Sequence, residues 1–421
     1  MKKKIRNLLW LIVCAAISVH FLSGCEEILD ELKAEISQSD IKSNIFKKPA
    51  KKTEAEQKEK QDVSEETEIK DVPKETETHT EGESFGRETD AAYAENYAYL
   101  TLNDTEREVY HEILTTILNH EEKIEVSTLD VDLLESAYRA ICADYGGLFW
   151  VSGYVYTQYS RGGEPTSMEF EPKYTMDADE REEVQQQIDA SVEELLAGIS
   201  IRDSDYAKAK YVFEILVQNV DYDIASENNQ NIISAFLNRA TVCQGYACAT
   251  QYLLHLLGIQ SVIVTGNANG ESHAWNLVRL DGDYYYMDTT WGNSRYLDSS
   301  SQMEKYVNYS YLAITSEEIS RTHILDNSFI LPECTNTRDN YFIKENRYFE
   351  EWTPEQIGAL LTESWNAGGG DVAVKFASHD LYEQALKYFI TDQHIADYCQ
   401  NISSIFYLED TELYVLTFHF L

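Results

Sequence analysis

The feature that most constrains the fold of this chain is a segment almost without charge. Residues 231–270 contain one formally charged side chain, Arg239, in a chain of 421 residues whose formal net charge is −39. A chain this acidic covers its surface with carboxylates, so a segment this bare is expected to lie mostly inside the protein. The fold is therefore expected to be built around residues 231–270.

The bare segment contains the pattern of a buried helix with a cysteine at its start. Residues 241–244 read Thr-Val-Cys-Gln, a capping-box pattern, and mostly apolar residues follow through Leu257 to a helix stop at Gly258. This pattern predicts that Cys243 is the second residue of the helix. Unpaired N–H groups and the helix dipole favour a thiolate there, so Cys243 is a candidate nucleophile.

A predicted hairpin follows the helix. Residues 260–265 are rich in β-formers, and the runs 272–280 and 284–291 flank Asp281 and Gly282. The Asp-Gly pair is a strong signal for a two-residue type I′ turn between antiparallel strands. Two antiparallel strands are therefore expected after the helix in the sequence.

The register of this hairpin brings a histidine and an aspartate together. A two-residue turn pairs His273 with Thr290. In the same register Trp275 faces Asp288, so His273 and Asp288 are diagonal neighbours on one face, with β-carbons about 7 Å apart. A thiol nucleophile needs a base, and the base needs a group that orients it, so Cys243, His273 and Asp288 form a candidate triad.

Three motifs in this region resemble the core of the transglutaminase-like superfamily, most closely its bacterial secreted branch. They are Val-Cys-Gln-Gly-Tyr-Ala at 242–247, His-Ala-Trp-Asn at 273–276 and Asp-Gly-Asp-Tyr-Tyr-Tyr-Met-Asp-Thr-Thr-Trp at 281–291. The cysteine, the histidine and the aspartate occur in the family's order, at spacings of 30 and 15 residues. The resemblance covers about residues 205–295, with a looser match at residues 219–223 and Gln230.

The resemblance implies an α+β protein with a papain-like core, in which a cysteine-bearing helix packs on an antiparallel sheet that carries the histidine and the aspartate. It implies acyl transfer from amides, through a thioester on Cys243, to an amine or to water. His273 would act as the base, and Asp288 would orient it. No cofactor is implied, and no metal is expected, because the sequence contains no calcium-loop pattern.

Five further side chains could contribute to the cleft: Gln230, Gln244 and Tyr222 to an oxyanion hole, and Trp275 and Trp291 to the lining. Core packing explains the two tryptophans equally well. The backbone N–H of Cys243 is the simpler oxyanion donor, because the capping pattern already uses Gln244. A metal site that joins Cys243 with Cys248 is not expected, because five residues along a helix rotate by about 140° and turn the two thiols to different faces.

The N-terminus predicts secretion and a lipid anchor. Basic residues at 2–6 precede an apolar run from Leu8 to Val19, too short for a spanning helix, and then Leu-Ser-Gly-Cys at 22–25. This motif resembles the lipobox of bacterial lipoproteins, in which a diacylglycerol is attached to the cysteine thiol, here that of Cys25. An ordinary signal peptide and an uncleaved signal anchor are the alternatives. The expected location is the extracellular face of the bacterial cytoplasmic membrane.

The remaining cysteines do not form a disulfide framework. Their number is odd and they are sparse for a secreted protein of this size, so at least one thiol is expected to be free. With Cys14 removed with the signal peptide and Cys25 carrying the lipid, those left are Cys142, Cys243, Cys248, Cys334 and Cys399.

Composition and pattern divide the chain into five parts. They are residues 1–24 (signal peptide), 25–90 (disordered tether), 91–200 (helical and hairpin lead-in), 201–330 (transglutaminase-like core) and 331–421 (small α/β domain). Helices are expected at 103–118, 177–196, 204–219 and from a capping box at 353–356, and strands at 148–159, 167–175, 340–348, 371–377, 403–407 and 412–420.

The acidic composition excludes nucleic acid as an expected partner, because carboxylates repel phosphates. The expected partner is a protein or peptide substrate, including cell-wall or surface proteins. The protein is expected to be a monomer that meets the membrane only through its lipid. Two alternatives to the acyl transferase stay open: a cysteine peptidase or amidase of the same fold, and a surface binding module without turnover.

Replacement of Cys25 by serine tests the anchor. Wild-type protein expressed in a bacterial host should incorporate labelled palmitate and partition into detergent, whereas Cys25→Ser should do neither, because serine has no thiol to receive the diacylglycerol. Cys14→Ser is the matched control for loss of a cysteine in the same segment. Palmitate label retained by Cys25→Ser would rule out the lipid anchor.

Overall fold

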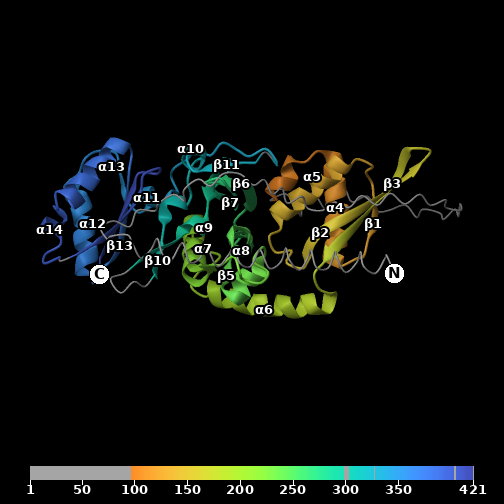
Figure 1. The fold of residues 1–421 in the computed structure, drawn as a ribbon, viewed down its shortest axis with the longest axis horizontal. Coiled ribbons are helices and arrows are strands. Elements are labelled where there is room, and N and C mark those ends of the chain that lie inside the picture. The colour runs from red at the N-terminus through yellow and green to blue at the C-terminus, as the bar shows by residue number, and fades with distance from the viewer. Residues whose placement is uncertain (1–95, 298–302, 327, 403, 421) are drawn as a thin grey trace, which may run out of the picture. The chain divides into compact units, whose positions relative to one another are not determined.

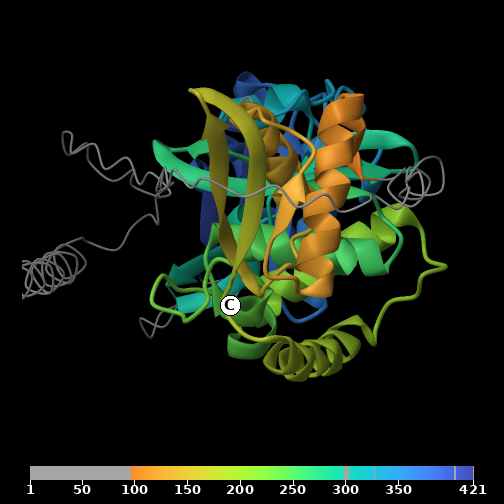
Figure 2. The same ribbon diagram turned by 90° about the vertical axis from the view of Figure 1, so that its right-hand side faces the viewer.

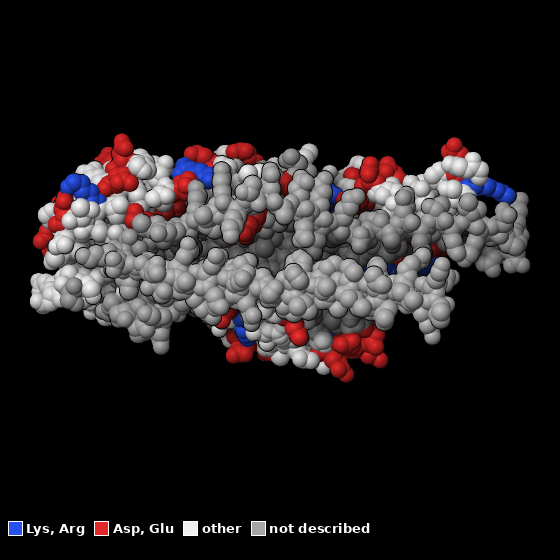
Figure 3. Space-filling view, viewed as in Figure 1, with Lys and Arg blue, Asp and Glu red and all other residues white. Residues whose placement is uncertain are grey.

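A computed structural model describes residues 96–297, 303–326, 328–402 and 404–420 of the chain (Figure 1). The predicted signal peptide, the lipid site at Cys25 and the predicted tether lie outside these residues. In the described part, no helix combines the length and the apolar character that crossing a membrane requires. Where described atoms are visible in Figure 3, carboxylates cover more of the surface than basic side chains do.

The lead-in region combines helices with a small sheet: α3 (Tyr97–Thr101), α4 (Asp104–Asn119), β1 (Ile124–Val126), α5 (Val131–Asp144), β2 (Val151–Arg161) and β3 (Glu164–Tyr174). The antiparallel sheet has the order β1-β3-β2, and Figure 2 shows the β2–β3 hairpin with β1 and α4 along one side of it. The predicted capping box at the start of α4 is confirmed: Asn103 accepts the Glu106 N–H, and Glu106 accepts the Asn103 N–H.

Two long helices follow where the sequence predicts them, α6 (Ala178–Leu196) and α7 (Asp205–Asn219). The side chain of Asp177 caps α6, and the side chain of Ser204 caps α7. Each accepts a backbone N–H that would otherwise lack a partner in the first helical turn.

The segment without charge forms the centre of the fold, as expected. Its helix, α8 (Cys243–Leu256), packs on β6 and β7 of an antiparallel sheet with the order β11-β6-β7-β8. The strands are β6 (Ser261–Ala268), β7 (Glu271–Leu280), β8 (Asp283–Met287) and β11 (His323–Leu325). Residues 245–251 of α8 are all buried, and Asn276 of β7 donates its amide N–H to the Ala247 carbonyl at 3.0 Å.

The start of α8 differs from the prediction. Its N-cap is Val242, without a side-chain hydrogen bond, so Cys243 is the first residue of the helix and not the second. Thr241 does not cap the helix, because it belongs to the short strand β5 (Ala240–Thr241) and its hydroxyl donates to the Asn229 carbonyl at 2.8 Å. Strand pairing thus overrides the local capping pattern.

The β7–β8 hairpin has the predicted register. Leu280 pairs with Asp283 next to the turn. Asp281 and Gly282 have φ angles of 48° and 93°. Positive φ at both central residues is what a type I′ turn requires, and its twist matches that of the flanking strands.

The second strand of this hairpin ends earlier than predicted. β8 stops at Met287, and Asp288 becomes the N-cap of the short helix α9 (Thr289–Gly292). Thr290 therefore lies in α9 and does not face His273 across the sheet. The helix forms because the Asp288 side chain accepts backbone N–H groups of its first turn.

The C-terminal residues form a second sheet with its own hydrophobic core. The sheet has the order β12-β13-β15-β14, from β12 (Tyr348–Phe349), β13 (Gly370–Phe376), β14 (Phe406–Asp410) and β15 (Val415–Phe420). Helices α12 (Pro354–Asn366), α13 (His379–Ala385) and α14 (Ile395–Tyr398) accompany it. The core includes Phe349, Ile357, Val374 and Phe418.

Two predictions in this region are wrong. The strand predicted at 340–348 is the helix α11 (Tyr341–Lys344), which Asn340 caps by accepting the Phe342 N–H, and only its last residue joins β12. The predicted capping box at 353–356 is absent, because the Thr353 side chain makes no cap hydrogen bond, although Pro354 does start α12.

The other elements of the described residues connect these regions. They are β4 (Asp221–Tyr222), β9 (Asn293–Leu297), β10 (Met303–Val307) and α10 (Ser316–Ser320), with short π-helical turns at Ser234–Asn238 and Leu386–Thr391 and a 3₁₀ turn at Tyr309–Tyr311.

One buried glutamine joins the lead-in region to the core. Gln251 of α8 accepts the Gly146 N–H at 2.6 Å and donates to the carbonyls of Ala143 and Ser261 at 2.6 and 3.1 Å. The side chain is 1% exposed, so water cannot replace these hydrogen bonds.

Gln251→Leu should therefore destabilise the protein by about 2–3 kcal/mol, because it leaves buried backbone groups without partners. The free energy of unfolding in urea measures the loss. Gln187→Leu makes the same chemical change at an exposed position of α6 and should alter stability by less than about 0.5 kcal/mol. Equal effects of the two variants would contradict the bridging role of Gln251.

Candidate active site

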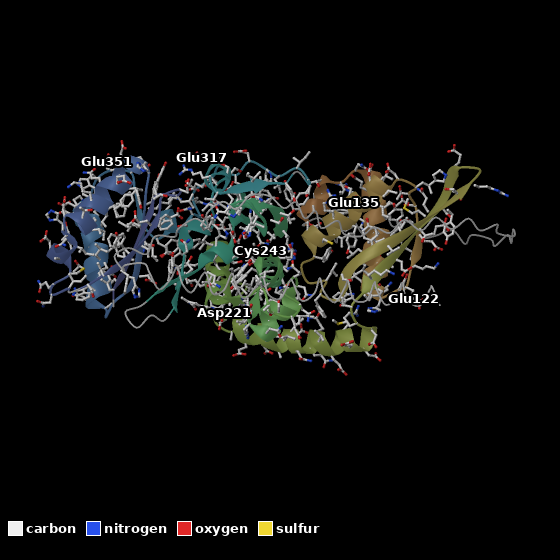
Figure 4. The ribbon with its side chains drawn as sticks, in the orientation of Figure 1. Glu122, Glu135, Asp221, Cys243, Glu317 and Glu351 are labelled. Atoms are coloured by element: carbon white, nitrogen blue, oxygen red, sulfur yellow. The ribbon has the colours of Figure 1, made fainter. Side chains whose placement is uncertain are left out.

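Cys243 lies half-buried at the start of α8, near the middle of the view in Figure 4. Its thiol contacts the backbone N–H of Ala274 on β7. Burial by itself would raise the pKa of this thiol. The His273 imidazole and the backbone N–H groups of Ala274 and Gln244 outweigh burial, because each stabilises the thiolate, and the pKa of Cys243 is lowered.

His273 lies on β7, and its two ring nitrogens face different partners. Nε2 lies 2.8 Å from Oδ2 of Asp288 and donates its proton, because an ionised carboxylate can only accept. Nδ1 is left for the contact with the Cys243 thiol. Burial disfavours the charged ring, but Asp288 and Cys243 outweigh it and raise the pKa of His273 to about 10. Asp288 and Cys243 therefore favour the imidazolium, which in turn favours the thiolate of Cys243.

Asp288 is 1% exposed, and both of its oxygens are occupied. Oδ1 accepts the backbone N–H groups of Thr290 at 2.8 Å and Trp291 at 3.1 Å. Oδ2 accepts from His273 and, at 3.1 Å, from Nε2 of His323. Burial would raise the pKa of this carboxyl, but the two histidines hold it well below its usual range.

His323 is a member of this cluster that the sequence analysis missed. It is the first residue of β11, and β11 reaches the site by pairing with β6, where His323 lies opposite Ala268. The sequence around His323 contains only a short apolar run, and no local pattern indicates this strand pairing. A prediction of the β11–β6 ladder would have been needed to find it.

The two glutamines proposed for the cleft do not present their side chains to Cys243 through any described contact. Gln230 is exposed, and its amide donates to Asn229 at 3.0 Å. The Gln244 amide lies 3.4 Å from the Cys248 sulfur. Gln244 contacts the Cys243 thiol through its backbone N–H and not through its side chain.

The three aromatic candidates take different places. Tyr222 is 51% exposed. Burial of part of the side chain is the main cause that raises the pKa of its phenol, and the charge of the nearby Cys243 thiolate adds to it. Trp275 is 1% exposed, and its ring stacks on His273 with centroids 5.8 Å apart. Trp291 is half-buried, with its centroid 5.9 Å from that of His273. Tyr222 and Trp291 thus reach the surface beside the site, whereas Trp275 supports the imidazole from the core.

The residues around Asp288 also meet the donor requirement of a metal site. Ligand atoms of His273, Asp288 and His323 lie within 4.8 Å of one another. Two imidazoles and a carboxylate are a donor set that zinc accepts. In this geometry, however, each Nε2–H is directed at the carboxylate oxygen, so hydrogen bonds alone account for the arrangement.

Residues 193–289 match the family described as the transglutaminase-like superfamily. The region covers Cys243, His273 and Asp288. The chain therefore contains a transglutaminase-like core, with a cysteine-bearing helix packed on an antiparallel sheet in an α+β fold. The resemblance of the three motifs to the transglutaminase-like superfamily and the α+β class are confirmed.

The chain is also similar to curated relatives over a limited region. Kyphoscoliosis peptidase of Mus musculus is 24% identical over 141 residues, and that of Homo sapiens is 23% identical over 141 residues. Each match covers 30% of this chain and 21% of the relative, so the chain spans about a fifth of the length of these relatives.

Two solved structures overlap with the chain in part. A TGase is 13% identical with a TM-score of 0.25, covering 35% of this chain and 54% of its own. The periplasmic domain of TgpA from Pseudomonas aeruginosa, bound to ethylmercury, is 14% identical with a TM-score of 0.20. This match covers 31% of this chain and 57% of the TgpA domain chain. The family assignment rests on the match of residues 193–289.

The opposite pKa shifts of two thiols on α8 predict selective alkylation. At about pH 7, iodoacetamide should label Cys243 well ahead of Cys248, because only a thiolate reacts and burial raises the pKa of Cys248 to about 12. As the pH falls below the pKa of ordinary thiols, a free cysteine should lose its labelling first. The labelling of Cys243 should decline only at lower pH, because its pKa is lowered. Mass spectrometry of labelled peptides measures both rates, with urea-unfolded protein as the control. Equal rates in the folded protein would contradict the activation of Cys243.

Proposed function

We propose that the protein is a surface lipoprotein that transfers acyl groups from amides of proteins or peptides through a thioester on Cys243. The observation that carries this proposal is the chain of contacts from the Cys243 thiol through His273 to Asp288, with the thiol pKa lowered in spite of burial. A structural cysteine in a core has no need of such contacts.

The first half of the reaction forms the thioester. The Cys243 thiolate attacks the amide carbonyl, and the carbonyl oxygen becomes an oxyanion. The backbone N–H of Cys243 is available to that oxyanion, because the first N–H groups of a helix have no partner within the helix. The His273 imidazolium gives its proton to the leaving amine, the C–N bond breaks, and the acyl group remains on sulfur.

The second half releases the acyl group. Neutral His273 takes a proton from an incoming amine or water, which attacks the thioester carbonyl. The C–S bond breaks, and Cys243 leaves as the thiolate beside the regenerated imidazolium. Asp288 keeps its charge throughout and fixes the orientation of the ring, as the acidic member of such a triad does.

Hydrolysis is the second candidate, and the curated relatives favour it. The proteins that match this chain over 141 residues are named peptidases. Water would then replace the amine in the second half, and the protein would be a cysteine peptidase or amidase with the same residues in the same roles. A binding module without turnover remains the alternative outside the enzyme class.

The location follows from the N-terminal motif. A lipid on Cys25 would hold the domain at the extracellular face of the cytoplasmic membrane, where cell-wall and surface proteins are the accessible substrates. The net charge of −39 argues against nucleic acid at that surface.

A paired assay tests the reaction. Purified protein is incubated with casein and a fluorescent primary amine, with cleavage of casein followed in parallel by mass spectrometry. Cys243→Ala should abolish transfer and cleavage, since the nucleophile and its base act as a unit, and His273→Ala should cost almost as much. Asp288→Asn should lower the rates of transfer and cleavage less than the other two substitutions do, because it disturbs only the orientation and charge of the imidazole.

Cys248→Ala is the matched control, because it removes a second thiol of the same helix and should leave the rates within about threefold of wild type. Turnover that survives Cys243→Ala would contradict the proposal. No turnover by the wild type on either substrate, together with slow alkylation of Cys243, would favour the binding module.

A further inference from the structure

The buried histidine His323 has no part in the reaction steps above, yet it touches the group that orients the base. Its side chain is 0% exposed, and its Nε2 lies 3.1 Å from Asp288 Oδ2. Oδ2 is also the oxygen that accepts from His273 at 2.8 Å. One carboxylate oxygen therefore holds two imidazoles.

The protonation of His323 at this contact follows from the partners of its ring. The ionised Asp288 carboxylate can only accept, so the Nε2 of His323 must carry a proton. On the other side of the ring, Nδ1 lies 2.8 Å from the Thr322 hydroxyl, whose single proton can go to Nδ1 or to the Ile319 carbonyl at 3.5 Å. With the ring proton on Nε2, Nδ1 is an acceptor and is the nearer of the two. Thr322 thus stabilises the tautomer that presents Nε2–H to Asp288.

The ring is also held by packing. Its centroid lies 4.8 Å from that of Trp275 and 4.7 Å from that of Trp291. The ring of His273 is 5.3 Å away. Rings on several sides restrict the rotation of the His323 side chain, so its Nε2–H keeps pointing at Asp288. A residue that orients the Asp288 carboxylate needs such a fixed direction.

We propose that His323 is a positioning residue that acts on His273 through Asp288. Its N–H holds Oδ2 in place and takes a share of the carboxylate charge, so that Asp288 orients the His273 imidazolium without binding its proton too tightly. The catalytic consequence rests on the proposed function of Cys243. The contact between His323 and Asp288 does not.

Two substitutions separate the N–H donor from the bulk of the ring. His323→Leu removes the donor, and the full charge of Asp288 then falls on His273, whose pKa should rise by about one unit. His323→Gln keeps an N–H in the region of Nε2 and should leave the His273 pKa near that of the wild type. Titration of protein labelled with ¹⁵N-histidine measures this pKa directly, without any turnover.

The kinetic expectation follows from the same shift. In His323→Leu, kcat for acyl transfer should fall about three- to tenfold with KM unchanged, because a less acidic imidazolium protonates the leaving amine more slowly. His323→Gln should restore most of the loss. His255→Leu, which removes an exposed histidine at the far end of α8, is the control and should change neither quantity.

Several results would overturn the proposal. They are a wild-type His323 with its only proton on Nδ1, an unchanged His273 pKa in His323→Leu, or equal effects of the leucine and glutamine variants. Bound zinc that disappears in His323→Leu would also overturn it, in favour of a metal site. A His273 shift in protein without turnover supports the positioning contact and contradicts the proposed function alone.

If His323→Leu does not fold, Thr322→Val carries the test. This variant leaves the ring in place and removes the hydroxyl that favours its tautomer, so the His273 pKa should rise by a smaller amount. Thr322→Val could instead show the same His323 tautomer and the same His273 pKa as the wild type. That result would contradict the role given to Thr322 and His323.

Discussion

The geometry of the candidate site depends on one buried carboxylate. Two backbone N–H groups from α9 and two imidazoles, from β7 and β11, surround the oxygens of Asp288. A charge inside a protein is costly unless donors satisfy it, and these donors keep Asp288 ionised. The ionised carboxylate holds His273 as an imidazolium, which in turn stabilises the Cys243 thiolate. Each of these effects depends on the one before it. The loss of one hydrogen-bond donor to Asp288 is therefore expected to change the pKa of the Cys243 thiol.

A competition between burial and hydrogen bonding separates two cysteines of the same helix. Cys243 receives N–H groups from both α8 and β7 beside the imidazolium, and these outweigh its burial. Cys248 is 5% exposed and has the Gln244 amide as a side-chain donor, so burial wins and raises the pKa of its thiol to about 12. The position at the start of the helix therefore matters because it places the thiol beside β7.

Sequence patterns succeeded where their cause is local. The capping box at Asn103 formed, and the Asp-Gly turn set the register that places His273 near Asp288. They failed where a distant segment competes for the same groups. Thr241 has the pattern of a cap, but pairing of β5 with β4 and the carbonyl of Asn229 use its backbone and its hydroxyl. The run at 340–348 failed for a different, local reason, because the Asn340 side chain caps α11 there by accepting the Phe342 N–H.

The sequence by itself determined the buried helix, the hairpin and the three residues that the structure brings together. Helix periodicity and turn chemistry act over a few residues, and three motifs in a family's order identified Cys243, His273 and Asp288. Only the tertiary structure decided that Cys243 starts α8, that Asp288 leaves the strand to cap α9, and that His323 joins the site. The last of these requires β11 to pair with β6, although β7, β8, α9, β9, β10 and α10 separate the two strands in the sequence, and the free energy of such pairing comes from the assembled sheet and its core. No pattern within β11 encodes its partner, so the second imidazole on Asp288 is a property of the fold.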